Sequence, residues 1–217
     1  DGSGNWSYGP TAELADGEYD FTAQATDGAG NTGTLSTAFT ATVDTTIAAP
    51  VVEDVTSDTG SSNTDFITND TTLVFNGSAD PNVSVQMEID SVNTGAPVVS
   101  DGTGDWSYDH TGTTLSEGVY SLTATATDTA GNSASTAAPV SLTVDLTVPT
   151  VTVEQSTGQD DPTNTLPITF DVTFSEPVLG FDETDVTMGG TATGVVFTVT
   201  PVSTKFANPV AAYTIDV

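Results

Sequence analysis

The chain repeats itself at an interval of about 100 residues, which is the length of one β-sandwich domain. Residues 1–8 read DGSGNWSY and return at residues 101–108 as DGTGDWSY. Residues 25–31 read ATDGAGN and return at residues 126–132 as ATDTAGN. Such a period indicates tandem domains of about this size in the repeating part of the chain.

Short strands account for most of the apolar residues. Tyr120, Leu122, Ala124 and Ala126 alternate with serine and threonine, which predicts a strand with one buried and one wet face. Three further segments alternate in the same way, namely residues 83–89, 140–144 and 168–174. No window combines helix-forming residues with an apolar period of 3.6, so we expect almost no helix.

A tyrosine stands two residues after an acidic-glycine pair in both repeats. The sequences are Asp16-Gly17-Glu18-Tyr19 and Glu117-Gly118-Val119-Tyr120. They resemble the tyrosine corner, in which a tyrosine near the start of strand F hydrogen-bonds back to the preceding loop. The predicted fold class is therefore all-β, with tandem immunoglobulin-like Greek-key β-sandwich domains.

A third recurring segment marks the domain ends. Residues 42–46 read TVDTT, residues 143–147 read TVDLT, and a proline follows each one closely. This pattern predicts a last strand that leads into a short linker, with boundaries near residues 49 and 149. We expect the C-terminal half of one domain at 1–49, a complete domain at 50–148, and the N-terminal part of a third domain, of a different subfamily, at 149–217. We also expect the chain to be a piece of a longer polypeptide.

Charge limits the possible partners. The 217 residues include 30 acidic side chains but only one lysine and no arginine, for a formal net charge of -29. Nucleic acids and anionic membrane surfaces need the basic residues that are missing, so neither is an expected partner. No apolar run approaches the length of a membrane span, so no membrane insertion is expected in this segment. Clustered carboxylates are instead suited to Ca²⁺ or Mg²⁺.

The chain has few side chains of the types that usually act in catalysis. His110 is the only histidine, Lys205 the only amine side chain, and cysteine is absent. Acid-base catalysis would have to use paired carboxylates. Because the acidic pairs fall in predicted loops and no sequence feature indicates an enclosing cleft, we expect the chain not to be an enzyme.

Several ordered motifs resemble one known family. They are DFITND at residues 65–70, GSADP at 77–81, GDWS at 104–107, EGVY at 117–120 and ATDTAGN at 126–132. In this order they resemble the bacterial Ig-like repeats of giant surface adhesins of the RTX type and of biofilm-associated adhesins. The resemblance implies a cell-surface, extracellular stalk for cell adhesion and biofilm formation, in which Ca²⁺ at the domain junctions stiffens a row of repeats.

Consecutive domains of this fold bring the end of the last strand onto the BC and FG loops of the next domain. At the first junction this gathers Asp44, Asp80, Asn82, Asp128 and Asn132. Three carboxylates and two amides could supply much of the six to eight oxygen ligands of Ca²⁺. The alternative is that the aspartate and asparagine of the FG loop only satisfy backbone groups of a tight turn.

Two further calcium sites are expected on the same reasoning. Asp145 would pair with Glu176 from the BC loop of the third unit, while Asp27 and Asn31 would face a preceding domain. For the acidic AB stretch, metal binding and plain solvation of the loop charges remain equally open. That stretch comprises Asp54, Asp58, Asp65, Asn69 and Asp70.

The sequence is compatible with three functions. The first is a structural extender whose partners are neighbouring Ig-like domains of the same polypeptide. The second is a subunit of an extracellular filament or surface layer, which would self-associate through edge strands. The third is a glycan-binding or protein-binding module that uses loop aromatics. Trp6 and Trp106 are expected to pack in or beside the core, with sugar contact as the alternative.

Overall fold

The computed structural model describes residues 4–10, 12–60, 62–191, 195–201 and 210–217. Asp1, Gly2 and Ser3 of the first turn motif, and Lys205, lie outside the described residues. Strands make up nearly all of the regular secondary structure of the described part, which has one short 3₁₀ helix at Glu183–Asp185, so the predicted all-β fold class is confirmed. The chain divides into two compact units, Asp1–Asp145 and Leu146–Val217. The predicted domain boundaries remain a prediction.

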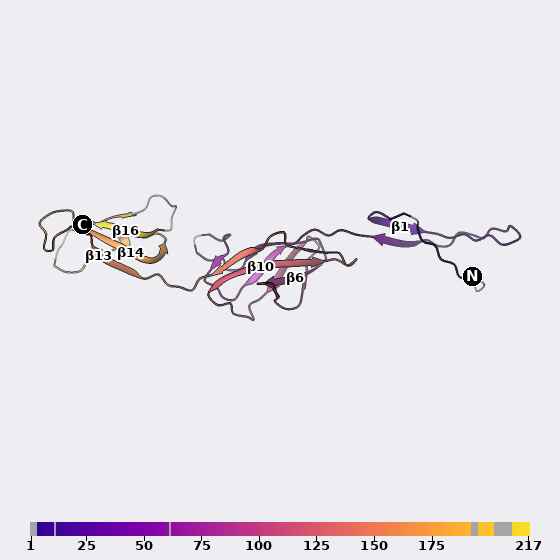
Figure 1. Cartoon of the computed structure of the whole chain (residues 1–217), viewed down its shortest axis with the longest axis horizontal. Helices are drawn as coiled ribbons and strands as arrows, with labels where there is room; N and C mark the ends of the chain where they lie inside the picture. The colour runs from indigo at the N-terminus through magenta and orange to yellow at the C-terminus, as the bar shows by residue number, and fades with distance from the viewer. Residues whose placement is uncertain (1–3, 11, 61, 192–194, 202–209) are drawn as a thin grey trace. The chain divides into compact units, whose positions relative to one another are not determined.

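The regular structure described before residue 45 is a hairpin of two antiparallel strands, β1 (Gly17–Phe21) and β2 (Phe39–Val43) (Figure 1). The register runs from Gly17 opposite Val43 to Phe21 opposite Phe39. A tyrosine corner is present, because the Tyr19 hydroxyl donates to the Ala15 carbonyl at 2.8 Å.

Residues 50–145 form a sandwich of two sheets. One sheet has the order β3 (Val51–Val55), β5 (Val74–Ser78) and β9 (Asp105–Asp109). The other has the order β4 (Ile67–Thr68), β12 (Val140–Val144), β10 (Gly118–Thr127), β6 (Ser84–Ile89) and β7 (Val92–Asn93), with β11 (Ser133–Ser135) on β10 and β8 (Val98–Val99) on β6. Because β5 and β6 lie in different sheets, as do β9 and β10, the chain crosses the sandwich in the predicted Greek-key manner.

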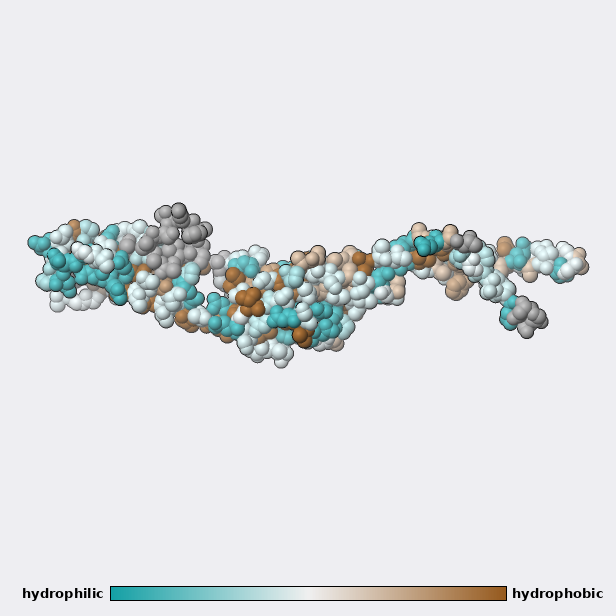
Figure 2. Space-filling model, viewed as in Figure 1, coloured by the Kyte–Doolittle hydropathy of each residue, from teal (hydrophilic) through white to brown (hydrophobic). Residues whose placement is uncertain are grey.

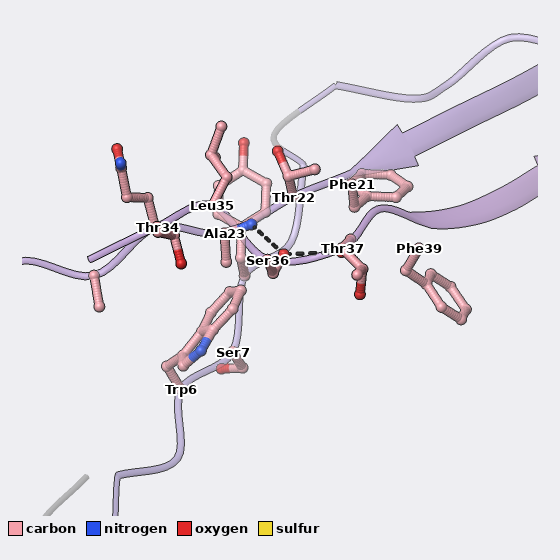
Figure 3. A pocket seen from close by; sticks show the side chains of 13 residues that line it. Trp6, Ser7, Phe21, Thr22, Ala23, Thr34, Leu35, Ser36, Thr37 and Phe39 are labelled. Atoms are coloured by element: carbon pink, nitrogen blue, oxygen red, sulfur yellow. Dashed lines mark hydrogen bonds between the residues drawn. The ribbon is translucent and has the colours of Figure 1, made fainter. Parts of the chain in front are cut away.

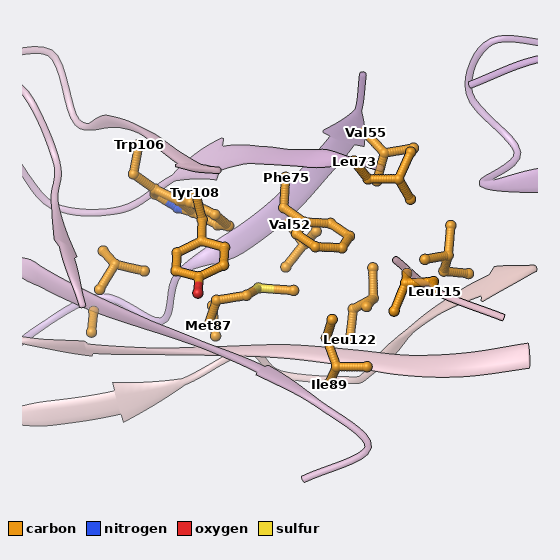
Figure 4. Close-up of a cluster of buried hydrophobic side chains, with 14 of the residues drawn as sticks. Val52, Val55, Leu73, Phe75, Met87, Ile89, Trp106, Tyr108, Leu115 and Leu122 are labelled. Carbon is orange, nitrogen blue, oxygen red and sulfur yellow. The ribbon is translucent and has the colours of Figure 1, made fainter. Parts of the chain in front are cut away.

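The core of the sandwich lies between these sheets and follows the predicted alternation. Leu122, Ala124 and Ala126 of β10 are fully buried, and their neighbours across the sheet, Val85 and Met87 of β6, are fully buried too. Figure 4 shows their partners from the opposite sheet, including aromatic rings that fill the centre. The second tyrosine corner is also formed, with the Tyr120 hydroxyl 2.9 Å from the Ser116 carbonyl.

One edge of the larger sheet is formed by β4, which pairs in parallel with β12. β4 lies beside β12 with Ile67 opposite Thr143 and Thr68 opposite Val144. The amide of Thr143 donates to the Phe66 carbonyl at 2.8 Å, and the amide of Asp145 donates to the Thr68 carbonyl at 2.9 Å. This pair joins an early strand of the domain directly to its last strand.

The second unit is a four-stranded antiparallel sheet with a small core. Its strands have the order β13 (Val151–Gln155), β14 (Thr169–Val178), β16 (Val210–Asp216) and β15 (Thr198–Pro201). Val172, Tyr213 and Ile215 are buried, and the rings of Phe174 and Phe181 pack edge-on against each other at 5.1 Å. The predicted inward-facing positions of β14 thus contribute to this core.

We expect the sandwich to lose stability as the pH falls from about 7.5 to about 5.5. His110 is buried against the rings of Phe75, at 5.9 Å, and Tyr108, at 6.2 Å. Burial lowers the pKa of His110 below 6.5, although the neighbouring Asp109 opposes the shift. The unfolded chain therefore binds the proton first, which destabilises the fold by up to about 1.4 kcal/mol per pH unit below 6.5.

Urea unfolding of the chain and of the variant His110→Phe, each at both pH values, measures this effect. Carboxylates titrate near pH 4 and change little in this range. The variant should show the smaller pH dependence, and equal dependence in both proteins would contradict the assignment to His110.

Candidate junction site

Three acidic side chains from distant parts of the sequence line one hollow in the first unit. Asp44 directly follows β2, Asp80 lies in the loop between β5 and β6, and Asp128 opens the turn between β10 and β11. With Asn82 they border a hollow of about 260 Å³. The structure thus brings together four of the five residues predicted for the first junction.

The linker after β2 is tied to the loops of the sandwich by direct hydrogen bonds. The amide of Ala48 donates to Oδ2 of Asp80 at 2.8 Å. The fifth predicted residue, Asn132, donates from Nδ2 to the backbone carbonyl of Asp44 at 3.1 Å. Between these two contacts the side chain of Ile47 packs against the sandwich core. The junction therefore has protein-to-protein contacts that need no ion.

The carboxylate of Asp128 stabilises the conformation of its own loop by accepting hydrogen bonds. Its Oδ1 accepts from the amides of Gly131 at 2.7 Å and Asn132 at 2.9 Å, and its Oδ2 accepts from Nδ2 of Asn132 at 2.8 Å. The hydrogen bond from the Asn132 side chain is the main cause that lowers the pKa of Asp128. The loop is therefore the tight turn considered above, in which Asp128 accepts hydrogen bonds from backbone amides. The turn also directs the side-chain amide of Asn132 toward the linker.

The carboxylates around this hollow are the kind of ligand that a hard cation such as Ca²⁺ prefers, but their positions in the structure are less suitable. Asp44 accepts from the Thr46 amide through Oδ1, and Asp80 uses Oδ2, so each has one carboxylate oxygen with no hydrogen-bond donor among the described residues. Three carboxylates around one hollow, with no basic side chain among its lining residues, favour a divalent cation. Among the described residues, however, no three acidic, histidine or cysteine side chains lie close enough to hold one ion. A Ca²⁺ ion here would require these carboxylates to come closer together.

The first repeat contains a copy of the same turn. Oδ1 of Asp27 accepts from the amides of Ala29 at 2.9 Å and Asn31 at 2.8 Å, and Oδ2 accepts from Nδ2 of Asn31 at 2.9 Å. These bonds, led by the one from the Asn31 side chain, lower the pKa of Asp27. Among the described residues, Asp27 belongs to no group of three acidic, histidine or cysteine side chains that could hold a metal ion.

The two residues predicted for the second junction belong to different compact units. Asp145 follows β12 as expected. Glu176 was expected in a loop, but it lies within β14, so that placement is wrong. The strand continues through Pro177 because the pairing with β16 shifts register between Thr173 and Val178. One carboxylate oxygen of Glu176, Oε1, is buried without a hydrogen-bond partner among the described residues. A calcium site that joins Asp145 to Glu176 remains a prediction.

Carboxylates of the acidic AB stretch accept hydrogen bonds from nearby backbone amides and side chains. Asp54 was expected in the loop but lies in β3, where it pairs with Asn76 of β5, and its carboxylate accepts a hydrogen bond from the Asn76 side chain. In the loop itself, Asp58 accepts from the Phe66 amide and Asp70 from the Thr72 amide. Oδ1 of Asp58, however, is buried without a hydrogen-bond partner among the described residues, so metal binding and solvated loop charges both remain open for this stretch.

Sequence reasoning missed two contributors to the junction, the backbone amide of Ala48 and the side chain of Ile47. Every residue except proline has a backbone amide, so the residue type does not indicate that the amide of Ala48 will donate to Asp80. Ile47 is an isolated apolar residue between threonine and alanine, and its position in a predicted linker could have indicated an anchor.

The model of the bacterial Ig-like domain family matches this chain twice, at residues 1–45 and 46–146. The chain therefore belongs to the family of bacterial Ig-like domains. Such domains are commonly found on extracellular surface proteins and are typically non-enzymatic. No curated protein matches the chain. The described residues include no helix that is long and apolar enough to cross a membrane.

Proposed function

We propose that the chain is a segment of the extender stalk of a large bacterial cell-surface adhesin, with domain junctions that bind Ca²⁺. The observation that carries the proposal is the linker at residues 44–48, which is hydrogen-bonded at both ends to the loops of the following sandwich. These contacts already restrain the linker without an ion, because each of its ends and its apolar residue Ile47 has a partner in the sandwich, and a bound Ca²⁺ would restrain it further.

The acidic charge of the chain supports the role of calcium. At a formal net charge of -29, the domains repel themselves and one another unless cations neutralise them. The hollow at Asp44, Asp80 and Asp128 collects three of these charges at one junction. A bound Ca²⁺ would cross-link the linker to both loops, and its affinity would lie near the 10⁻⁴ to 10⁻³ M typical of extracellular modules.

Small-angle scattering with about 5 mM Ca²⁺, and then with chelator, tests the proposal. We expect the chain to become measurably more flexible on chelation. The double variant Asp44→Asn/Asp80→Asn should remain flexible in calcium, because its hollow has lost two of three charges. The matched control Glu154→Gln/Asp160→Asn removes the same charge from exposed positions in the other unit and should behave as the parent chain.

Calorimetric titration of Ca²⁺ into the same three proteins separates binding from stiffening. Binding that the junction variant and the control retain equally would place calcium elsewhere. Scattering that changes with protein concentration, and not with calcium, would favour a filament or surface-layer subunit instead.

A further inference from the structure

The linker that follows β2 is also held from the side of the first repeat. Asp16 stands directly before β1, and its Oδ1 accepts from the amide of Thr45 at 3.0 Å and from the hydroxyl of Thr45 at 2.7 Å. Its Oδ2 accepts from the hydroxyl of Thr46 at 3.2 Å. Three donors from two adjacent linker residues thus bind one carboxylate, and we call Asp16, Thr45 and Thr46 together the Asp16 latch.

The latch uses the ionised form of Asp16. The hydrogen bond from the Thr45 side chain is the main cause that lowers the pKa of Asp16, and the Thr45 amide and the Thr46 hydroxyl lower this pKa too, although desolvation opposes the shift. Hydrogen bonds to an ionised carboxylate are roughly twice as strong as those between neutral groups. The latch is therefore made of the stronger kind of hydrogen bond.

The latch lies at one end of a ladder that continues beyond β1 and β2. The amide of Ala23 donates to the hydroxyl of Ser36 at 3.0 Å, a bond drawn in Figure 3, and the amide of Ser36 donates to the Ala23 carbonyl at 2.9 Å. At the other end of the hairpin Gly17 lies opposite Val43. The ladder therefore places the Asp16 latch at the point where the linker begins.

Side-chain burial contributes little to this hairpin. Phe39 is 71% exposed, and Figure 2 shows hydrophobic side chains at the surface of the hairpin. Trp6 is 73% exposed whereas Trp106 is 3% exposed, so with the described residues the expectation that both tryptophans pack is confirmed for Trp106 and wrong for Trp6. A two-stranded hairpin is marginally stable by itself. Order at its open end therefore depends on hydrogen bonds such as those of the Asp16 latch.

The latch also bears on the position of Asp44. Oδ1 of Asp44 accepts from the amide of Thr46 at 3.3 Å, and Thr46 belongs to the latch. Asp44 borders the hollow together with Asp80 and Asp128. A restraint on Thr46 is therefore also a restraint on one of the three carboxylates of the hollow.

The second repeat differs at two of the three latch positions. Glu117 takes the place of Asp16 and Leu146 takes the place of Thr45, while Thr147 matches Thr46. Leucine has no hydroxyl, so the bond that is shortest in the latch, at 2.7 Å, cannot form at Leu146. The complete latch is thus a property of the first junction and not of every repeat.

We propose that the Asp16 latch fixes the linker to the first repeat without an ion, and that Asp16 is a positioning residue that keeps Asp44 at the hollow. The linker is then restrained from both sides, since Asp80 and Asn132 hold it on the side of the sandwich. Because the latch contains no metal, it acts before calcium binds and persists when calcium is removed. The inference goes beyond the proposed calcium-dependent stalk and stands even if this junction binds no ion.

Hydrogen exchange of the linker amides, measured by NMR in the presence of chelator, tests the latch. In the variant Asp16→Ala we expect the Thr45 amide to exchange about tenfold faster, because it loses a charged acceptor. The Thr46 amide should also exchange severalfold faster, although its own acceptor is unchanged. The matched control Asp20→Ala removes the same charge from the same hairpin, where the carboxylate accepts from a threonine of β2, and should leave both amides as in the parent chain.

A milder variant keeps the test decisive if Asp16→Ala opens the hairpin, which faster exchange of the Tyr19 amide would reveal. Thr45→Val removes one hydroxyl and keeps the carboxylate of Asp16 and both linker amides. We expect about threefold faster exchange of the Thr45 amide, because one of the three bonds of the latch is lost. The Tyr19 amide should then exchange as in the parent chain.

Spin labels measure the freedom of the hairpin directly. The chain contains no cysteine, so cysteines introduced at the exposed positions Glu18 and Ser141 carry the only labels. In chelator we expect a broader distribution of label distances for Asp16→Ala than for the parent chain. The proposal is overturned if Asp16→Ala and Asp20→Ala match the parent in both exchange and label distances. A faster Thr45 amide beside an unchanged Thr46 amide would overturn the positioning role of Asp16.

Discussion

Replacing Trp106 by alanine is expected to destabilise the sandwich of residues 50–145 by about 3–5 kcal/mol. The ring is almost completely buried, it packs against Gly77, and its indole nitrogen donates to the Ser78 carbonyl. The substitution removes a large apolar side chain, leaves a cavity between the sheets, and deprives a backbone carbonyl of its donor. At the upper end of this range, much of the total stability of a small domain is lost.

The chain contains its own control for this substitution. Trp6→Ala removes the same side chain from the same sequence motif, but there the ring is mostly in water. We expect a change within about 0.5 kcal/mol, as for other surface substitutions. Urea unfolding of the two variants, followed by far-ultraviolet circular dichroism, measures both. Equal losses in the two variants would mean that Trp6 is covered in solution.

Gly77→Ala is expected to destabilise the same domain by about 3 kcal/mol, at or above the usual upper range for overpacking. The added methyl group would meet the Val51 carbonyl oxygen at 2.0 Å, and a backbone atom in a paired strand cannot move aside as a flexible side chain can. Either β3 must separate from β5 at this point or the Trp106 ring must leave its place. Both outcomes open the smaller sheet.

Gly102→Ala provides the comparison, because a Cβ atom at Gly102 would meet no atom within 4 Å. We expect no more than about 0.5 kcal/mol for this variant. Thermal unfolding of the two alanine variants against the parent chain decides the point. A small effect at both positions would show that the smaller sheet adjusts more easily than its packing suggests.

Residue alternation predicted the core of the sandwich because period two is a property of each strand by itself. Leu122, Ala124 and Ala126 could be assigned to one face without knowledge of their partners, and all three are fully buried. The tyrosine corners were predictable for a similar reason, since the hydroxyl of Tyr120 reaches a carbonyl only four residues away.

Burial that depends on a distant strand was not predictable in this way. Trp6 and Trp106 stand in nearly identical motifs, yet among the described residues only Trp106 has a covering strand, β5, which places Gly77 at the facing position. Likewise the sequence indicates that Asp128 belongs to an oxygen-rich loop. It does not indicate that three donors, two of them backbone amides, already occupy its carboxylate. Partner strands and backbone donors are set by topology, which residue types reveal only indirectly.

The parallel pairing of β4 with β12 determines how the domain responds to tension. Once a pull along the chain reaches these strands, the bonds from Thr143 to Phe66 and from Asp145 to Thr68 lie across the direction of force and must rupture together in shear. Pulling instead through Glu117 and Asp145, beside the paired residues Gly118 and Val144 at one end of β10 and β12, would unzip the antiparallel ladder one bond at a time. Single-molecule force measurements should therefore give the higher rupture force for the first geometry, so that a domain with marginal thermodynamic stability can still resist a mechanical load.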